Sequence, residues 1–100
     1  MKIYLSGPIS NQPDGNRLEF SLAERHLKSQ GHTVVNPHHI ANDGTWNHAM
    51  RADIKAMMDC DAIYVIKGWE LSKGSCLEVY LALKLSMQII NGGPNGDENC

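Results

Sequence analysis

The apolar run Ala-Ile-Tyr-Val-Ile at 62–66 is the feature that most constrains the fold of this chain. Its β-branched and aromatic residues follow one another without polar alternation, which predicts a strand buried on both faces. Such strands belong to parallel sheets that carry helices on both sides. Gly68 then breaks the run, a polar loop follows, and a helical pattern begins near Gly74. Open α/β sheets bind ligands at this kind of junction, beyond the carboxyl ends of the strands.

Strand and helix patterns alternate along the whole chain. We expect strands at 2–6, 32–36, 62–66 and 87–91, and helices at 17–30, 46–60 and 75–86. Gly31 is expected to end the first helix in the left-handed conformation. The order β-α-β-α-β-α-β predicts a three-layer α/β fold of the flavodoxin or Rossmann type, an open parallel sheet of four to five strands with helices on both faces.

Length and composition limit the class of protein. One hundred residues, 42% of them hydrophobic, suffice for one domain with its own core over residues 1–91, and the Gly- and Asn-rich residues 92–100 predict a flexible C-terminal tail. A net charge of −2 gives no basic surface, so no nucleic-acid polymer is expected as a partner.

Nothing in the sequence predicts a membrane partner or export. No apolar run reaches the length of about 18 residues that a transmembrane helix requires. The first residues pass directly into a strand pattern, which leaves no room for a signal peptide. Cys60, Cys76 and Cys100 are odd in number and widely spaced, which predicts free thiols in a reducing, cytoplasmic location.

The loops after the first and third strands are expected to meet at one edge of the sheet. Small residues and backbone N–H groups would surround an anion or a sugar there. The candidate binding residues are Gly7, Pro8, Ile9, Ser10, Asn11, Trp69, Ser72, Gly74 and Ser75. Trp69 is expected on the rim, where an exposed indole either stacks on a planar base or covers an oligomer contact.

Glu78 is the candidate catalytic residue of this edge. It shares a helical stripe with Leu81, Ala82 and Leu85, so its carboxylate is expected to point inward as a nucleophile or a general acid or base. The sequence Ser75-Cys76-Leu77-Glu78 also matches a capping box, in which Glu78 only bonds the backbone N–H of Ser75. Spacing alone favours the cap.

Asp53 and Tyr4 each allow two interpretations. Asp53 lies at the edge of the apolar side of its helix and serves either the cleft or a surface ion pair with Arg51 or Lys55. Tyr4 lies on the first strand, where its ring is expected in the core. Its hydroxyl is also near the end of that strand and is able to donate to a carboxylate in the cleft.

The five histidines form no recognisable metal site. None of their spacings, including His38-His39, gives the ligand pair of a zinc enzyme or a tetrahedral Cys and His set. No glycine-rich dinucleotide or P-loop motif occurs either. We therefore expect neither a metal nor another cofactor.

Four sequence blocks, in this order, resemble the nucleoside 2-deoxyribosyltransferase-like superfamily. They are Ile3-Tyr4-Leu5-Ser6-Gly7-Pro8-Ile9, Met50-Arg51-Ala52-Asp53-Ile54, Cys60-Asp61-Ala62-Ile63 and Ser72-Lys73-Gly74-Ser75-Cys76-Leu77-Glu78. The resemblance spans roughly residues 2–91 and is nearest to short phage and bacterial members of unassigned function. It implies a homo-oligomer with sites near the subunit interfaces.

The resemblance implies a role for each candidate. Glu78 matches the nucleophile that attacks the anomeric carbon of a 2-deoxyribosyl group, and Asp53 matches the acid that handles the proton of the base. Tyr4 matches the hydroxyl that positions the nucleophile. Ser72 matches the phosphate-binding serine of the 2′-deoxynucleoside 5′-phosphate N-hydrolase branch, whereas the transferase branch has an acidic residue there. The implied ligand is a small-molecule deoxynucleotide.

The first loop departs from the hydrolase branch. That branch has a serine and then an arginine for phosphate binding, where this chain has Pro8 and Ser10. Arg17 and Lys73 are the candidates to replace the arginine. The leading hypothesis is hydrolysis of a deoxynucleotide through a glycosyl-enzyme, and nucleoside deoxyribosyl transfer or non-catalytic nucleotide binding in the same cleft stay open.

A third class of function is also open. An interaction protein would use exposed aromatic and methionine side chains as its contact surface. The candidates for that surface are Trp46, Trp69, Met50, Met57 and Met58.

Overall fold

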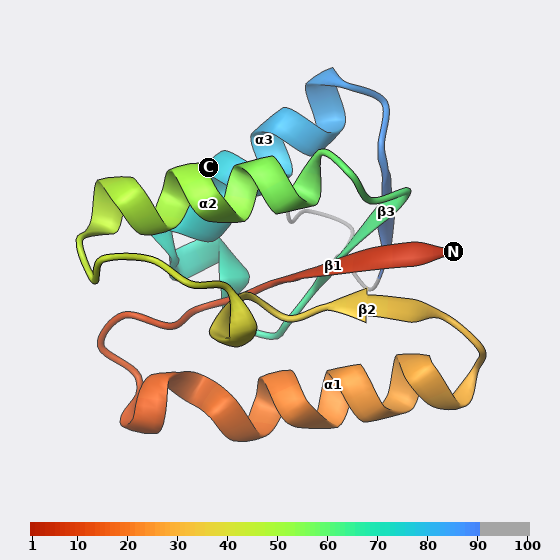
Figure 1. Ribbon diagram of the computed structural model, residues 1–100, viewed down its shortest axis with the longest axis horizontal. Coiled ribbons are helices and arrows are strands. Elements are labelled where there is room, and N and C mark those ends of the chain that lie inside the picture. The colour runs from red at the N-terminus through yellow and green to blue at the C-terminus, as the bar shows by residue number, and fades with distance from the viewer. Residues whose placement is uncertain (91–100) are drawn as a thin grey trace.

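The computed structural model describes residues 1–90 and contains a parallel sheet with helices on both faces (Figure 1). The strands are β1 (Lys2–Ser6), β2 (Thr33–Val35), β3 (Ala62–Val65) and β4 (Gln88–Ile90), in the order β2-β1-β3-β4. The helices are α1 (Arg17–Ser29), α2 (Trp46–Met57) and α3 (Lys73–Lys84), with 3-10 helices η1 (Pro13–Asn16), η2 (Pro37–His39) and η3 (Trp69–Leu71). The predicted three-layer α/β fold is confirmed, and its strand order is that of the flavodoxin type.

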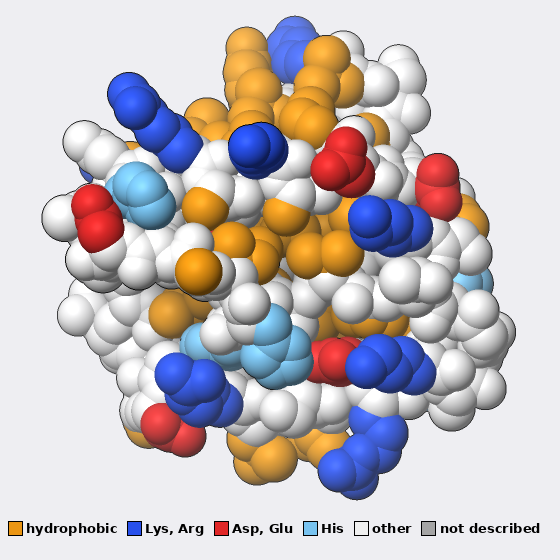
Figure 2. Space-filling view, viewed as in Figure 1, with side chains coloured by type: hydrophobic (Ala, Val, Ile, Leu, Met, Phe, Trp, Pro, Cys, Tyr) orange, Lys and Arg blue, Asp and Glu red, His pale blue; other side chains and the backbone are white. Residues whose placement is uncertain are grey.

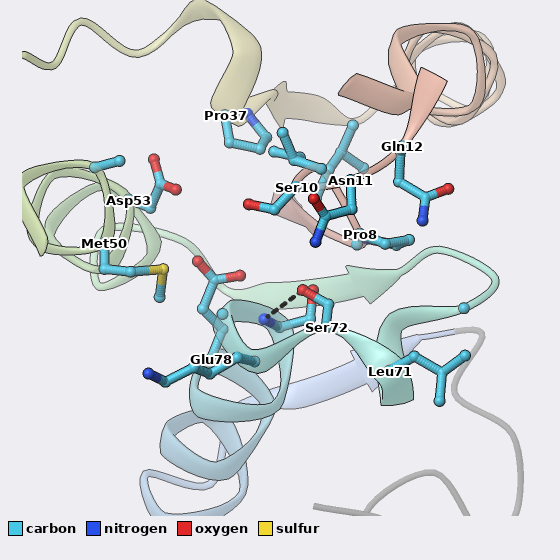
Figure 3. Close-up of a pocket in the computed structure, with 18 of the residues that line it drawn as sticks. Pro8, Ser10, Asn11, Gln12, Pro37, Met50, Asp53, Leu71, Ser72 and Glu78 are labelled. Atoms are coloured by element: carbon cyan, nitrogen blue, oxygen red, sulfur yellow. Dashed lines mark hydrogen bonds between the residues drawn. The ribbon is translucent and has the colours of Figure 1, made fainter. Parts of the chain in front are cut away.

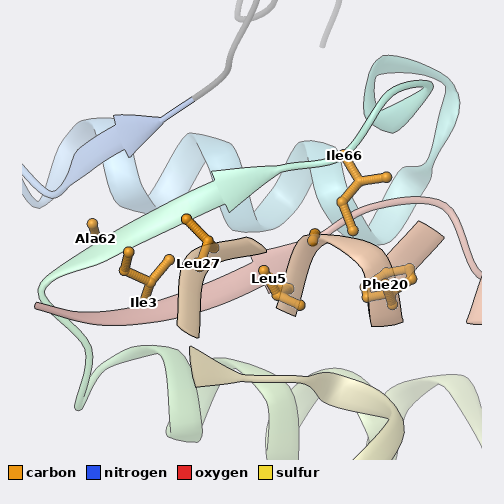
Figure 4. Close-up of a cluster of buried hydrophobic side chains, with 7 residues drawn as sticks. Ile3, Leu5, Phe20, Leu27, Ala62 and Ile66 are labelled. Atoms are coloured by element: carbon orange, nitrogen blue, oxygen red, sulfur yellow. The ribbon is translucent and has the colours of Figure 1, made fainter. Parts of the chain in front are cut away.

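One face of the sheet packs against α1. Ile3 and Leu5 of β1 and Ala62 of β3 are fully buried there and form a cluster with Phe20 and Leu27 of the helix (Figure 4). Because side chains alternate along a strand, the intervening residues of β1 and β3 face the other side.

The opposite face packs against α2 and α3. Tyr4, Ile63 and Val65 are buried there together with Met57 of α2 and Val79 of α3. The central strands are therefore buried on both faces, as the unbroken apolar run of β3 predicts. Tyr4 thus lies on the sheet face shared with the two helices that carry Asp53 and Glu78.

The strand order places a topological switch point between β1 and β3. The chain passes from β1 through α1 to β2 on one side, and then through α2 to β3 on the other side of β1. The strands end together, with Ser6 of β1 opposite Val65 of β3. The loops that follow them leave the sheet side by side at its carboxyl edge, where open α/β sheets bind ligands.

The start of α3 differs from the prediction. The helix begins at Lys73, and Ser72 is its N-cap, with Ser72 Oγ accepting a hydrogen bond from the backbone N–H of Ser75 at 3.3 Å. Ser75 therefore lies inside the first turn, and the predicted capping box from Ser75 to Glu78 is wrong. Gly31 does follow α1 in the left-handed conformation, with φ of 91°.

The predictions about membrane helices, surface charge and cysteine thiols have different outcomes. Within residues 1–90 no helix is long and apolar enough to cross a membrane. Acidic and basic side chains are interspersed on the face seen in Figure 2.

Cys60 is a free thiol but Cys76 is disulfide-bonded, so the prediction of free thiols is wrong at Cys76. Cys100 and the predicted tail at 92–100 lie outside the described residues.

Gly7 is the position where β1 turns into the first loop, and it has no space for a side chain. A Cβ atom there would lie 2.8 Å from Cβ of Ile66 and 3.3 Å from Cζ of Phe20. We expect Gly7→Ala to lower the free energy of unfolding by about 1–3 kcal/mol, because Ile66 Cβ is rigid and the strand end must shift. Urea unfolding measures this loss.

Gly74→Ala is the matched control for Gly7→Ala. Its added Cβ would meet Sδ of Met50 at 3.0 Å, and that flexible side chain is able to move away. Alanine is also favoured over glycine inside a helix by about 1 kcal/mol. Equal destabilisation by both substitutions would contradict the packing role of Gly7.

Candidate active site

A cavity of about 530 Å³ opens at the carboxyl edge of the sheet, between the loops after β1 and β3 and the first turns of α2 and α3. Its volume falls within the range of small-molecule sites. The lining includes eight of the nine predicted binding residues: Gly7, Pro8, Ile9, Ser10, Asn11, Ser72, Gly74 and Ser75. The three predicted catalytic residues, Tyr4, Asp53 and Glu78, also line it.

Glu78 is buried, with 4% of its surface exposed, and its carboxylate points into the cavity (Figure 3). Both of its oxygens accept hydrogen bonds from β1. Tyr4 Oη donates to Oε2 at 2.8 Å, and Ser6 Oγ donates to Oε1 at 2.7 Å. The carboxylate is thus held by the neighbouring strand and not by its own helix start, which excludes the capping interpretation.

Ser6 is a site residue that the sequence analysis missed. Its Oγ also lies 3.0 Å from Oγ of Ser75. Since a serine hydroxyl has one hydrogen and an ionised carboxylate only accepts, Ser6 donates to Glu78 while Ser75 donates to Ser6. Ser6 follows Tyr4 by two residues on the same strand, so both project from one face. That spacing is the signal that was available in the sequence.

The surroundings of Glu78 change its acidity. Burial raises the pKa of its carboxyl to about 7, and the negative charge of Asp53 adds to the rise, while the hydrogen bonds from Ser6 and Tyr4 lower it. Desolvation is the largest of these effects because a buried carboxylate loses its contact with water. Glu78 is therefore divided between its acid and its carboxylate form near neutral pH.

Asp53 projects into the cavity from α2, across from Glu78 (Figure 3). It is 9% exposed, and burial raises the pKa of its carboxyl to about 6. The alternative interpretation of Asp53 as a surface partner for Arg51 or Lys55 is wrong. Two carboxylates with raised pKa values that face one cavity are typical of sites for proton transfer or nucleophilic attack.

Both interpretations of Tyr4 are correct. Its ring is fully buried in the core, and its hydroxyl ends at Glu78. Burial and the nearby charge of Glu78 raise the pKa of the phenol far above its ordinary value. The hydroxyl therefore remains protonated and serves as a permanent hydrogen-bond donor to the carboxylate.

The structure buries Trp69 and places Trp46 at the cavity. Trp69 is 3% exposed and packs in the core, so its predicted place on the rim is wrong. Gly68 precedes it with φ of 90° and starts the 3-10 turn η3. Trp46 lines the cavity instead and is 41% exposed.

The contact surface predicted for an interaction protein is likewise wrong at most of its positions. Trp69, Met50 and Met57 are buried, and of the five candidates only Trp46 and Met58 are exposed. These two do not form the continuous apolar surface that the hypothesis needs.

Two basic side chains reach the cavity, one from the loop after β3 and one from the first residue of α3. Lys67 and Lys73 line it, and Nζ of Lys73 lies 4.7 Å from the ring centroid of Trp46. Arg17, the other predicted substitute for the arginine of the hydrolase branch, does not line the cavity. It lies 3.6 Å from the carboxylate of Asp14 in an exposed pair.

The first loop is fixed by its own backbone and by one histidine. Asn11, Asp14 and Asn16 adopt φ between 51° and 63°, a region in which asparagine and aspartate are enriched. His38 Nε2 lies 2.9 Å from the carbonyl oxygen of Gly15. These features define the conformation of the loop, whose residue Asn11 lines the cavity.

A metal ion is one group that a cavity with acidic side chains is able to hold. Within the described part of the chain, no group of three or more His, Cys, Asp and Glu side chains is placed to hold a metal ion. Asp53 and Glu78 are the two acidic residues in the cavity lining. Their available chemistry is that of a nucleophile and of a general acid or base.

Comparison with known proteins assigns the chain to a family. The model described as Domain of unknown function (DUF4406) matches residues 1–91. The chain belongs to this family. The match spans the whole cavity lining of this DUF4406 protein, and a comparison with curated proteins finds no match.

In this DUF4406 protein, Tyr4→Phe tests how the carboxylate is held. The substitution keeps the buried ring and removes the hydroxyl that donates to Glu78. A hydrogen bond to a charged group contributes about 1.5–3 kcal/mol, so we expect any reaction that uses the Glu78 carboxylate to slow about 10- to 150-fold. The pKa of Glu78 should rise further, because one donor to its ionised form is lost.

Tyr64→Phe is the control for that experiment, because it removes the same hydroxyl from a tyrosine that packs on the opposite face of the sheet, against the α1 cluster. Initial rates over a range of pH measure both effects. An unchanged rate with Tyr4→Phe would show that its hydroxyl has no part in positioning Glu78.

Proposed function

We propose that this protein hydrolyses the N-glycosidic bond of a 2′-deoxynucleoside 5′-monophosphate through a covalent glycosyl-Glu78 intermediate. The observation that supports the proposal most is the buried Glu78 carboxylate, held by Tyr4 and Ser6 at the wall of a cavity that Asp53 also lines. The resemblance to the nucleoside 2-deoxyribosyltransferase-like superfamily, on these same residues, supplies the substrate class.

The first chemical step transfers the sugar to the enzyme. A Glu78 oxygen forms a bond to C1′ as the bond between C1′ and the base nitrogen breaks, and the electron pair passes to the base. Asp53 donates the proton that the leaving base takes up. A nearby carboxylate also stabilises the positive charge that develops on the sugar.

The second step returns the enzyme to its starting state. Water attacks C1′ and gives a proton to the Asp53 carboxylate, and the bond from C1′ to Glu78 breaks. Two displacements at one carbon give net retention of configuration. Tyr4 and Ser6 keep hold of the Glu78 carboxylate as it leaves.

The polar end of the cavity is the place for the phosphate. Ser10, Asn11 and Ser72 line it with hydroxyl and amide groups, and Lys67 adds positive charge, whereas Nζ of Lys73 is engaged with the Trp46 ring. Ser72 caps α3, whose N-terminus carries a partial positive charge. Together these groups replace the serine and arginine that the hydrolase branch has in its first loop.

The two carboxyl groups together predict the pH dependence of hydrolysis. The reaction needs one proton on the pair, so that one group is a carboxylate and the other an acid. With pKa values of about 6 for Asp53 and about 7 for Glu78, both are protonated below pH 6 and both are ionised above pH 7. We expect kcat/KM to follow a bell with its maximum between about pH 6 and 7.

Measuring initial rates from pH 4.5 to 9 checks this expectation. Burial raises the pKa of both carboxyl groups, so the pair shares its last proton between Asp53 and Glu78 in the free enzyme. Hydrolysis uses the form in which that proton lies on Asp53. A rate that rises steadily to pH 9 would contradict the pairing of the two acids.

Non-catalytic nucleotide binding is the second candidate, and one observation favours it. Burial raises the pKa of Glu78 to about 7, so part of its carboxyl groups is protonated at neutral pH, and a protonated carboxyl is a poor nucleophile. A binding module would give tight binding in calorimetry without turnover, and Glu78→Gln would leave the affinity unchanged.

A substrate panel tests the proposed function directly. Purified protein is incubated with the four common deoxynucleoside monophosphates, the four ribonucleotides and the four free deoxynucleosides, and released base is quantified by chromatography. We expect release from the deoxynucleoside monophosphates alone, and none with Glu78→Ala. Exchange of an added free base into product would instead identify deoxyribosyl transfer. No release from any compound, or equal release by Glu78→Ala, would refute hydrolysis.

The proposal includes a homo-oligomer, as the resemblance implies, and a cytoplasmic location, for which the free thiol of Cys60 is the remaining support. Leu77, Tyr80 and Leu83 are exposed along α3 and give one subunit an apolar stripe for a second copy. Light scattering coupled to size-exclusion chromatography tests this, and a monomer at micromolar concentration would contradict it.

A further inference from the structure

One face of α2 forms a continuous wall of the cavity. Its lining residues are Trp46, Ala49, Met50 and Asp53. These positions are three, four and seven residues apart, so they share one side of the helix. Asp53 and Trp46 are separated along that side by about 10 Å, at about 1.5 Å per residue.

The wall has polar chemistry at one end only. Asp53 supplies a carboxyl group, while Ala49 and Met50 offer only apolar contact, and Trp46 follows at the outer end. Such a wall has few groups that hydrogen-bond to the edge of a base. It is suited to contact with the flat, apolar faces of an aromatic ring.

The Trp46 ring is held in place although much of it is exposed. Nζ of Lys73 lies 4.7 Å from the ring centroid, and Nε1 would lie 3.9 Å from a Cβ at Gly74, so the indole lies against the first turn of α3. The 41% exposed fraction leaves ring surface for a ligand. A fixed ring loses little conformational freedom when a ligand binds to it.

We propose that Trp46 binds the leaving base by stacking and makes this site prefer purine over pyrimidine deoxynucleotides. This inference rests on the proposed function, in which Asp53 donates a proton to the base. A base that meets Asp53 extends along the α2 wall past Ala49 and Met50. The bicyclic purine ring reaches further towards Trp46 than a pyrimidine does, and it offers a larger face for stacking.

Binding to a catalytically inactive form tests the inference without requiring turnover. In the Glu78→Gln background, calorimetry gives the affinities for a purine deoxynucleoside monophosphate, a pyrimidine one and 2-deoxyribose 5-phosphate, which has no base. When an aromatic side chain that stacks on a base is replaced by alanine, the affinity for the base falls about 5- to 150-fold. We expect Trp46→Ala to weaken purine binding within this range and pyrimidine binding less. The affinity for 2-deoxyribose 5-phosphate should not change.

Two further variants distinguish the loss of stacking on Trp46 from a disruption of the whole cavity. Trp46→Phe keeps an aromatic face and is expected to retain most of the affinity for the purine nucleotide. Leu71→Ala removes another exposed apolar side chain from the lining and should leave the purine preference unchanged. Fluorescence adds a local readout, because Trp46 is accessible to quenchers while Trp69 is buried and serves as the internal reference.

Several outcomes would overturn the inference. They are equal weakening of the nucleotides and of 2-deoxyribose 5-phosphate by Trp46→Ala, unchanged purine affinity in that variant, and no binding of any nucleotide. The proposed hydrolysis alone is refuted if the wild type releases no base while Trp46→Ala still changes the nucleotide affinities as expected.

Discussion

Glu78→Gln is expected to stop base release, lowering its rate by at least about 10³-fold, and at the same time to stabilise the folded protein above pH 7. The amide cannot attack C1′, yet it has the shape of the carboxyl group and is able to bond with Tyr4 and Ser6. Loss of activity together with a gain in stability distinguishes a functional group from a structural one.

The gain in stability follows from the pKa of Glu78. Folding raises this pKa from its ordinary 4.5 to about 7, so between these pH values the unfolded chain binds fewer protons than the folded one. Stability therefore falls as the pH rises through this window. Above pH 7 the cost is about 3 kcal/mol, at about 1.4 kcal/mol for each pKa unit. Glu78→Gln removes this cost.

Urea unfolding at pH 5 and pH 8 measures the effect. The difference between Glu78→Gln and the wild type should be small at pH 5 and about 1–3 kcal/mol in favour of the variant at pH 8. Glu19→Gln is the control, since Glu19 is exposed on α1. A variant that is less stable than the wild type at pH 8 would show that the carboxylate supports the fold.

Asp53→Asn is expected to give the second large loss, about 10²- to 10⁴-fold for natural nucleotides, because the departing base receives no proton. A substrate whose leaving group needs no proton, such as a nitrophenyl deoxyriboside phosphate, should lose far less. The bell-shaped pH profile should become a curve that rises to a plateau, since Glu78 alone then has to ionise.

Rates with both substrates, measured side by side, check this expectation. Asp59→Asn is the control, because Asp59 is exposed just beyond the end of α2. Equal losses for the natural and the nitrophenyl substrate would assign Asp53 to substrate binding and not to proton transfer.

The fold was predictable because its signals are local. The apolar run at 62–66 requires cover on both faces, and the alternation of strand and helix patterns leaves few topologies besides a parallel sheet. Element ends were less certain. The structure ends α2 at Met57, where the spacing predicts Cys60, since helix ends depend on the packing around them.

The candidate site was predictable in its residues and less so in its contacts. Ser75 and Glu78 have the spacing of a capping box, but Ser72 is also a serine at the start of the same helical pattern and is the N-cap in the structure. What decides between them is the bond from Tyr4 to Glu78 across 74 residues, which no local pattern contains. Trp69 shows the same limit, because the turn after Gly68 directs its ring into the core.

The central claim is that Glu78 forms a covalent bond to the sugar, and mass spectrometry tests it most directly. A deoxynucleoside monophosphate with fluorine at C2′ slows both steps, because fluorine destabilises the positive charge on the sugar, and so allows the intermediate to accumulate. We predict a protein mass increased by one fluorinated phosphodeoxyribosyl group, located on the peptide with Glu78 and absent from Glu78→Gln. Release of base without any such adduct, at a rate that Glu78→Gln shares, would contradict the account.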